Sequence, residues 1–327
     1  MKRNLKKILL SLTGVSFCLA SCSVASPTKI QAFQCDALFE YLDYEEGRIS
    51  NSLKEEVDKL ENIFDPYKEG TELYRLNKER NLTVSDDLLS CLKEAVALKE
   101  GTDGYFNPFM GKLSKDWMSF INEKRDNPLS EEEIKTHLTE IDSTSLSFEG
   151  NKVTINGSAD IDLSGICKGY IIDKLYESVK EKTEYYMVNA GHSSVLLGKK
   201  NNKDNDSFVV SLLENEFTFS AKDTTISTSG VNEQFRIHSD GNMYSHLINP
   251  KTGSAKVNDT KEAVLVGRDG SIGDALATAF IFMDNEERLS LASKENIKYA
   301  IYDGGSINRG WSYMSEGLNI EPKKTNK

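Results

Sequence analysis

The spacing of apolar positions predicts amphipathic helices in the first half of the chain. Apolar side chains recur every three or four positions in a charged background, which indicates a helix over residues 50–64. A second helix is expected over 85–101, where a serine can cap the helix and two aspartates follow in its first turn. Ser130 followed by Glu133 forms a capping-box pattern, so a third helix should begin there.

From position 146 the apolar period changes to two, which is typical of strands. Residues 146–148 and 153–155 flank a Glu-Gly-Asn turn and predict a hairpin, and strands then alternate with helices to the end of the chain. We expect strands near 184–189, 207–213, 216–220, 233–238, 242–248, 262–268 and 297–302, and helices near 166–181, 272–283 and 286–294. Because no long linker, low-complexity tract or repeat follows residue 36, the pattern predicts a single compact α+β body over 37–327, with two lobes, mixed sheets and packed helices.

The first residues have the features of a secretion signal. Four basic residues precede an apolar run over 8–20, which is too short to span a bilayer core of about 30 Å as a stable helix. Residues 1–21 are therefore predicted to be a signal peptide. The sequence LASC at 19–22 resembles the bacterial lipobox, so we expect lipidation of Cys22, a tether over 22–36, and an extracytoplasmic protein anchored to the bacterial cell membrane. The alternative is an ordinary signal peptide with an incidental cysteine.

Composition and charge exclude several classes of function. The 327 residues include 38% apolar and 28% charged side chains, as in globular proteins, and the net charge of −11 argues against a nucleic-acid partner. Beyond Cys22 only Cys35, Cys91 and Cys167 remain, an odd number that argues against a disulfide framework. The chain has no GxxxxGK(S/T), HExxH, CxxC or GxSxG pattern, so P-loop hydrolysis, zincin proteolysis, thiol redox and α/β-hydrolase chemistry lose their main support.

Two segments combine glycine with hydroxyl groups where a ligand could bind. In residues 160–170 a strand is expected to run into Ser164-Gly165 and a following helix, whose free amide groups and Lys168 could bind a phosphate. The alternative is a strand-turn-helix with a capping serine. Residues 225–230 read as a hydroxyl-rich turn at a strand end, and such turns most often bond only their own backbone.

Two further segments carry candidate catalytic and metal-binding groups. His246 lies on a strand-like run before a Pro-Lys-Thr-Gly turn, and it is the best candidate for a general base, although a lone histidine is more often structural. Asp274 and Thr278 lie four residues apart at a helix start, so their oxygens share one face and suit Mg²⁺. The alternative for Asp274 is a helix N-cap.

Taken together and in this order, these segments resemble the ApbE family, the FAD:protein FMN transferases. The family shows a DLGGIAKGY-like run, a TSG turn, a SHIIDPRTG-like run and an ADALATA-like helix start. This chain has DLSGICKGY at 162–170, TSG at 228–230, SHLINPKTG at 245–253 and GDALATA at 273–279. Upstream, GTELYRLN at 70–77 resembles the family's SELSRLN, and GYFNP at 104–108 resembles its GAFDP.

The resemblance implies a T-fold-related body and an extracytoplasmic enzyme that uses FAD and Mg²⁺. Such an enzyme transfers FMN to a threonine or serine hydroxyl of an exported acceptor protein and releases AMP. By this analogy Asp274, Thr278 and the backbone carbonyl of Gly165 hold the metal, and His246 takes the proton from the acceptor hydroxyl. The analogy assigns flavin nucleotide contacts to Asn77, Tyr105, Asp162, Lys168 and Thr228.

The chain departs from the family pattern at positions close to these residues. Asn107 replaces the aspartate of GAFDP, His192 stands where the family has GGD, Gly273 replaces an alanine, and Asn249 replaces the aspartate of IDP. None of these changes removes an expected metal ligand, but His192 is a second candidate for the general base.

Two other functions stay open on the sequence alone. A flavin-binding lipoprotein without transferase activity would need no base, and an FAD pyrophosphatase would use the same groups with water as the acceptor. An adhesin or solute-binding lipoprotein would have no reason to carry the Asp274–Thr278 pair.

Overall fold

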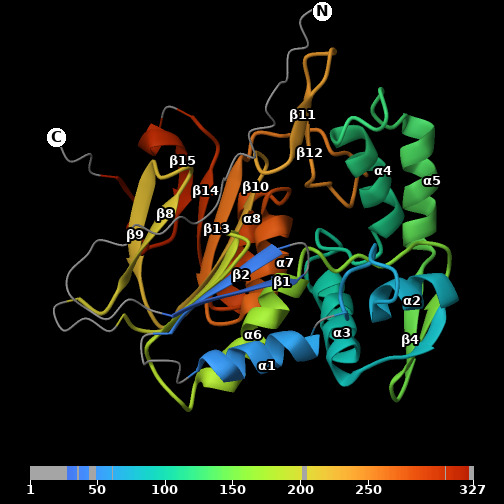
Figure 1. The fold of residues 1–327 in the computed structure, drawn as a ribbon. Helices are drawn as coiled ribbons and strands as arrows, with labels where there is room; N and C mark the ends of the chain where they lie inside the picture. The colour runs from blue at the N-terminus through green and yellow to red at the C-terminus, as the bar shows by residue number, and fades with distance from the viewer. Residues whose placement is uncertain are drawn as a thin grey trace, which may run out of the picture.

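The computed structural model describes residues 28–34, 37–43, 49–60, 62–200, 205–305 and 307–323. The predicted signal peptide, Cys22 and Cys35 lie outside these residues. Figure 1 shows two lobes, one built around a large sheet and one mainly helical. The helices are α1 (Ser50–Leu60), α2 (Glu72–Glu79), α3 (Asp86–Gly101), α4 (Gly111–Ile121), α5 (Glu131–Asp142), α6 (Cys167–Val179), α7 (Gly270–Phe280) and α8 (Asn285–Lys294).

An antiparallel sheet organises the larger lobe. Its strands, in spatial order, are β1 (Thr28–Gln34), β2 (Ala37–Asp43), β6 (Tyr186–Ala190), β7 (Ser194–Leu197), β10 (Thr224–Gly230), β13 (Glu262–Gly267), β14 (Lys298–Tyr302) and β15 (Trp311–Met314). All neighbouring pairs in this sheet run antiparallel. Because β10 and β13 lie side by side near its centre, residues 228–230 come next to residues 262–264.

Both faces of this sheet are buried. Ala263 and Leu265 of β13 belong to the core shared with α6 and α7, whereas Val264 between them packs into a second apolar cluster. That cluster lies under a small sheet formed by β8 (Phe208–Leu212), β9 (Phe217–Ala221) and β16 (Glu321–Pro322). Burial on two faces explains why β13 reads as a continuous apolar run rather than an alternating one.

The second lobe holds the upstream motifs. It contains α2 to α5 and a small sheet of β3 (Asn81–Thr83), β5 (Lys152–Asn156) and β4 (Ser145–Glu149). A separate hairpin of β11 (Phe235–Ile237) and β12 (Met243–Ser245) lies beside α4 (Figure 1). A short 3₁₀ turn at Ile307–Gly310 precedes β15.

The prediction of an α+β body is confirmed, with some differences in the elements. The capping box of Ser130 and Glu133 is present at α5, and the predicted hairpin is formed by β4 and β5. The tether was expected to reach residue 36, but residues 28–34 form the edge strand β1, which is held by backbone pairing with β2. The expected hydroxyl-rich turn at 225–230 is strand β10, because β7 and β13 pair with it on both sides. No helix in the described part of the chain is long and apolar enough to cross a membrane.

Candidate active site

The predicted metal ligands meet where helices α6 and α7 cross. The crossing is close: a Cβ added at Gly169 would lie 2.0 Å from the carbonyl oxygen of Gly270. This approach lets the Gly169 amide, in the first turn of α6, donate a 2.8 Å hydrogen bond to Oδ2 of Asp274. One of the amides expected to bind phosphate is therefore directed at a carboxylate of the neighbouring helix, where the positive end of the α6 dipole favours negative charge.

Asp274 is buried and held on both of its oxygens. Besides the Gly169 amide, the Ser194 hydroxyl donates a short hydrogen bond to Oδ1 of Asp274. The N-cap of α7 is Asp269, whose side chain accepts from the Ile272 amide, so the alternative reading of Asp274 as a helix cap is wrong. Each carboxylate oxygen keeps a second lone pair with which it could bind a cation.

Thr278 and Gly165 lie close to each other, and each carries an oxygen atom of a kind that binds metal ions. Thr278 lies one helical turn beyond Asp274, and its Oγ1 is 3.1 Å from the Ser229 Oγ of β10. A Cβ added at Gly165 would lie 3.8 Å from the same Oγ1. A carboxylate, a hydroxyl and a backbone carbonyl are hard oxygen donors of the kind that Mg²⁺ prefers. In the described ranges no group of three or more His, Cys, Asp or Glu side chains could hold a metal, so an ion here would depend on these neutral oxygens, water or phosphate as well.

His246 lies just after β12, next to Glu233 and within the influence of the positive charge of Lys168. Its backbone amide donates to the Gln234 carbonyl at 2.9 Å, and its Nδ1 lies 3.4 Å from the same oxygen. Its Nε2 faces Oε2 of Glu233 at 3.8 Å. Burial lowers the pKa of His246 to about 4, with a further contribution from the positive charge of Lys168, so the imidazole is neutral at pH 7.

Two carboxyl groups have raised pKa values: Glu233, next to His246, and Glu262, which interacts with Glu233. Burial raises the pKa of Glu233 to about 7; the charge of Asp274 adds to the shift and that of Lys168 opposes it. Burial raises the pKa of Glu262, at the start of β13, to about 8, and Glu233 contributes as well. Charged groups from α6, α7, β13 and the loop before β11 thus act on one another, and we call Lys168, Asp274, Glu233, Glu262 and His246 the charged cluster. Such interactions are the pattern expected of a functional site.

The segment leading to Gly165 is fixed by Asn77 and Arg80. The Asn77 side chain accepts from the Ile161 amide at 2.7 Å and donates to the Ile161 carbonyl at 2.8 Å. Arg80 follows in a left-handed conformation and donates to Asp160 Oδ1 at 2.9 Å and to the carbonyls of Gly157 and Ala159. The amide group of Asn77 is thus occupied in positioning residues 160–162.

Asp162 and Lys168 flank the turn that contains Gly165. Asp162 is buried; its Oδ1 accepts from the Ser164 amide at 2.9 Å, and its Oδ2 lies 3.4 Å from the Tyr67 hydroxyl. Lys168 is partly exposed, with its Nζ 3.4 Å from the Ser164 carbonyl. These contacts order the turn and leave the lysine cation beside it, at the position expected for a phosphate contact.

The remaining predicted residues have different surroundings. The Tyr105 ring lies under Nζ of Lys251 at 4.4 Å, so it borders the turn that follows His246. Thr228 is buried, and its amide and hydroxyl both donate to the Ser193 carbonyl, at 2.7 and 3.1 Å. The Thr228 hydroxyl therefore connects β10 to the turn between β6 and β7. His192 adopts a left-handed φ of 63° in that same turn and bonds to Asn189.

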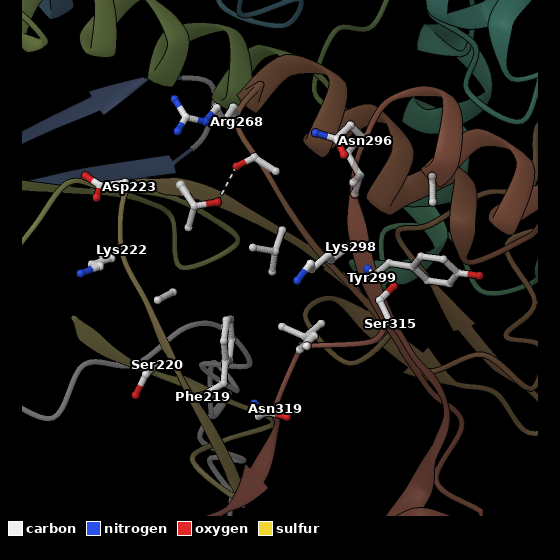
Figure 2. Close-up of a pocket in the computed structure, with 18 of the residues that line it drawn as sticks. Phe219, Ser220, Lys222, Asp223, Arg268, Asn296, Lys298, Tyr299, Ser315 and Asn319 are labelled. Carbon is white, nitrogen blue, oxygen red and sulfur yellow. Dashed lines mark hydrogen bonds between the residues drawn. The ribbon is translucent and has the colours of Figure 1, made fainter.

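A cavity of about 1110 Å³ lies elsewhere in the molecule. Figure 2 shows that Arg268, Asp223, Lys298 and Asn319 surround it. It opens at the ends of β10 and β13 opposite to Ser229 and Glu262, and none of the predicted site residues lines it. This cavity is therefore separate from the charged cluster that includes Asp274 and His246.

Three polar residues in or next to the charged cluster were not predicted from the sequence. Ser194 and Glu262 lie on strands with no motif of their own, so no local pattern marks them. Glu233 comes three residues after the TSG sequence, and this closeness of a carboxylate to a family motif could have marked it as a candidate site residue.

Comparison with known proteins identifies the family of this chain. The model of the ApbE family matches residues 25–301. A relative from Chlamydia trachomatis named FAD:protein FMN transferase is 23% identical over 310 residues, which cover 88% of this chain and 94% of the relative. One of the same name from Vibrio cholerae is 26% identical and covers 76% of this chain and 78% of its own.

Solved structures show the same fold. The flavin transferase ApbE from Vibrio cholerae superposes with a TM-score of 0.73 at 21% identity, over 88% of this chain and 97% of the other. The apo form of the flavinyl transferase ApbE from Pseudomonas stutzeri gives a TM-score of 0.72 at 16% identity, over 89% and 95% of the two chains. Because the family model matches most of the length of this chain, the chain belongs to the ApbE family.

Proposed function

We propose that this chain is an FAD:protein FMN transferase that moves FMN from FAD to a threonine or serine hydroxyl of an exported protein and releases AMP. The observation that carries the proposal is the placement of Asp274 against the N-terminal turn of α6 and of Gly165 next to Thr278, with Lys168 and His246 in the same charged cluster. The names of the relatives support the same activity.

Asp274, Thr278 and the Gly165 carbonyl would hold Mg²⁺. A magnesium ion supplies positive charge that stabilises the oxygens of a reacting diphosphate. Lys168 adds a second positive charge beside the turn, and the positive end of the α6 dipole favours the same negative groups. Together these residues bind and orient the diphosphate of FAD.

His246 would act as the general base. The acceptor hydroxyl oxygen forms a bond to the phosphorus of the FMN half, and the bond from that phosphorus to the bridging oxygen breaks, so AMP departs with that oxygen. The hydroxyl proton passes to Nε2 of His246, which is neutral at pH 7 because its pKa is lowered to about 4. A positioned base of this kind contributes a factor of about 10² to 10⁴ in rate.

The direct test combines the purified protein with FAD, Mg²⁺ and candidate exported acceptor proteins. Mass spectrometry of co-expressed exported proteins, searched for an FMN adduct, identifies the acceptor. We expect a fluorescent, acid-stable flavinylated protein and an equal amount of AMP, and EDTA should stop the formation of both. If AMP and free FMN accumulate whatever acceptor is present, the protein is an FAD pyrophosphatase. If flavin binds without release of AMP, it is a flavin-binding lipoprotein.

His246→Ala separates the base from the binding groups. We expect this variant to lose transfer activity while it still binds FAD, because His246 is not one of the proposed metal ligands Asp274, Thr278 and Gly165. Unchanged turnover would remove the proposed role of His246, and His192→Ala then becomes the variant to measure.

We further propose that Cys22 carries a lipid anchor and that the domain works outside the cytoplasm. The lipobox-like sequence supports this location, and each buried methylene of an acyl chain contributes about 0.8 kcal/mol to membrane binding. Fractionation of cells that express the full chain should place it in the membrane fraction, and Cys22→Ala should release it. Wild-type protein in the soluble fraction would contradict the proposal.

A further inference from the structure

The hairpin formed by β11 and β12 has one open edge beside His246. On its inner side β12 is bonded again, since the Ser245 amide donates to Ala255 at 3.0 Å and the Val257 amide donates to Met243 at 2.9 Å. On the other side β11 pairs only with β12 among the strands of the described residues. The outer edge of β11 is therefore available to another strand.

The register shows which backbone groups face that edge. The His246 amide donates to the Gln234 carbonyl, and the His238 amide donates to the Asn242 carbonyl at 3.0 Å. Even-numbered positions of β11 thus bond to β12. The amide and carbonyl groups of Phe235 and Ile237 consequently point away from β12, because successive residues of a strand direct them to opposite sides.

The side chains of β11 also alternate between two sides, one packed against the protein and one exposed. Arg236 anchors the strand: its Nη1 donates to the Phe120 and Arg125 carbonyls at 2.8 Å, and its guanidinium lies 4.5 Å from the centre of the Phe120 ring. Phe235 and Ile237 are on the opposite face, 41% and 69% exposed. Apolar side chains on an unpaired strand edge favour association with another strand, and proteins usually avoid them.

This edge is continuous with the position where the acceptor must react. The Gln234 carbonyl bonds to His246 on the β12 side of the hairpin, whereas Glu233, two residues before Phe235, has its Oε2 3.8 Å from Nε2 of His246. A strand laid along the outer edge of β11 therefore runs toward the residue that contacts the proposed base. Three residues and two apolar side chains form a much smaller contact than the ~1,200 Å² or more of a stable protein interface. A briefly bound substrate segment fits this edge better than a second copy of the chain.

We propose, on the basis of the proposed function, that the acceptor protein binds as an extended segment paired to the outer edge of β11, with apolar side chains packed on Phe235 and Ile237. The main-chain hydrogen bonds fix the direction of the segment, and the apolar contacts select it. Pairing along β11 carries the target hydroxyl to Nε2 of His246. The edge acts on the acceptor alone and leaves FAD binding unchanged.

Steady-state transfer assays test this inference with two probes: the acceptor protein identified by its FMN adduct, and a synthetic peptide of its flavinylated segment. The double variant Phe235→Ser/Ile237→Ser should raise KM for both probes by about tenfold or more, the size expected when central apolar contacts are removed. The affinity for FAD should stay at the wild-type value. Ile237→Pro removes an outward amide without breaking the pairs with β12, and it should raise KM as well.

Val209→Ser is the matched control. Val209 is 44% exposed on β8, which is also an edge strand but lies in a different small sheet, with β9 and β16. The control should keep the wild-type KM, and circular dichroism should show that all variants are folded. An unchanged KM in the double variant, or an equal rise of KM in the control, overturns the inference. The inference is also overturned if the wild type self-associates in sedimentation experiments and the variants with a changed KM do not. If the wild type modifies no acceptor at all, it is the proposed function that fails.

Discussion

The pairing of His246 with Glu233 answers a difficulty in the proposed chemistry. A base with a pKa of about 4 is free to accept a proton at pH 7, but it holds that proton weakly. Glu233 lies 3.8 Å from the nitrogen that would receive it. Its carboxylate would stabilise the imidazolium as it forms, and Lys168, which acts on both groups, favours the ionised carboxylate.

We expect Glu233→Gln to lower kcat for transfer by about tenfold, in the range of a lost charge-assisted contact. Gln keeps the shape of the side chain, so FAD binding should not change. The decisive comparison is the double variant Glu233→Gln/His246→Ala, which should be no slower than His246→Ala alone if the carboxyl acts through the imidazole. Additive losses in stopped-flow measurements would show that Glu233 has a separate role.

The metal hypothesis is tested at Thr278. Thr278→Val keeps the branched shape but removes the hydroxyl, so we expect the Mg²⁺ concentration for half-maximal activity to rise by about tenfold or more. Ser229→Ala, which removes only the hydroxyl that contacts Thr278 at 3.1 Å, should have a smaller effect. A magnesium titration in which both variants resemble the wild type would contradict the assignment.

At the scale of single elements, the position of Asp274 depends on the close crossing of α6 and α7. Gly169→Ala would place a methyl group 2.0 Å from the Gly270 carbonyl oxygen, so the helices must separate. We expect a loss of about 1–3 kcal/mol in the free energy of unfolding, together with a strong loss of activity because the amide bond to Asp274 is disturbed.

Gly101→Ala in α3 is the control for this substitution. A Cβ at Gly101 would meet only Nζ of Lys294, at 3.9 Å. Alanine favours helix, so this variant should be as stable as the wild type or slightly more stable. Thermal unfolding of the two variants side by side measures the difference, and equal stability would show that α6 can move at little cost.

Elements with strong local signals were predictable from the sequence, and elements defined by their partners were not. Ser130 and Glu133 fix the start of α5 through bonds within one turn, so sequence reading located it correctly. The threonines and serines of β10 predict a turn, and only pairing with β7 and β13 makes this segment a strand. The same holds for β1, whose pairing with β2 cannot be seen in its own residues.

At the scale of the whole molecule, the charged cluster consists of residues that are far apart in the chain. Asp274 and Thr278 could be proposed as partners because a helix sets their spacing. Ser194 donates to Asp274 only because β7 and α7 lie against each other in the fold. Glu262 belongs to the charged cluster only because β13 pairs with β10. Motifs therefore suggest the candidate residues, while the order of the strands in the sheet decides which carboxyl groups lie near them.

Buried carboxyl groups make the stability of the whole fold depend on pH. Burial raises the pKa of Glu262 to about 8, and burial raises the pKa values of Glu233 and Asp173 to about 7. Unfolded carboxyl groups titrate near 4.3, so the folded protein binds more protons than the unfolded chain between these values. Their stabilising effect is present below about pH 4 and is lost as the pH rises through 7 and 8.

We therefore expect the midpoint of thermal unfolding to fall as the pH is raised from 6.5 to 8.5. His246 shifts stability in the opposite direction, but only between pH 6.5 and about 4, where the unfolded imidazole takes up a proton before the folded one does. Glu262→Gln removes the group with the highest of these pKa values, so its unfolding midpoint should fall less over the same range. Glu286→Gln, on the exposed face of α8, should follow the wild type. A wild-type midpoint that rises above pH 7, or a Glu262→Gln profile parallel to it, would mean that these carboxyl groups are ionised in the folded protein at neutral pH.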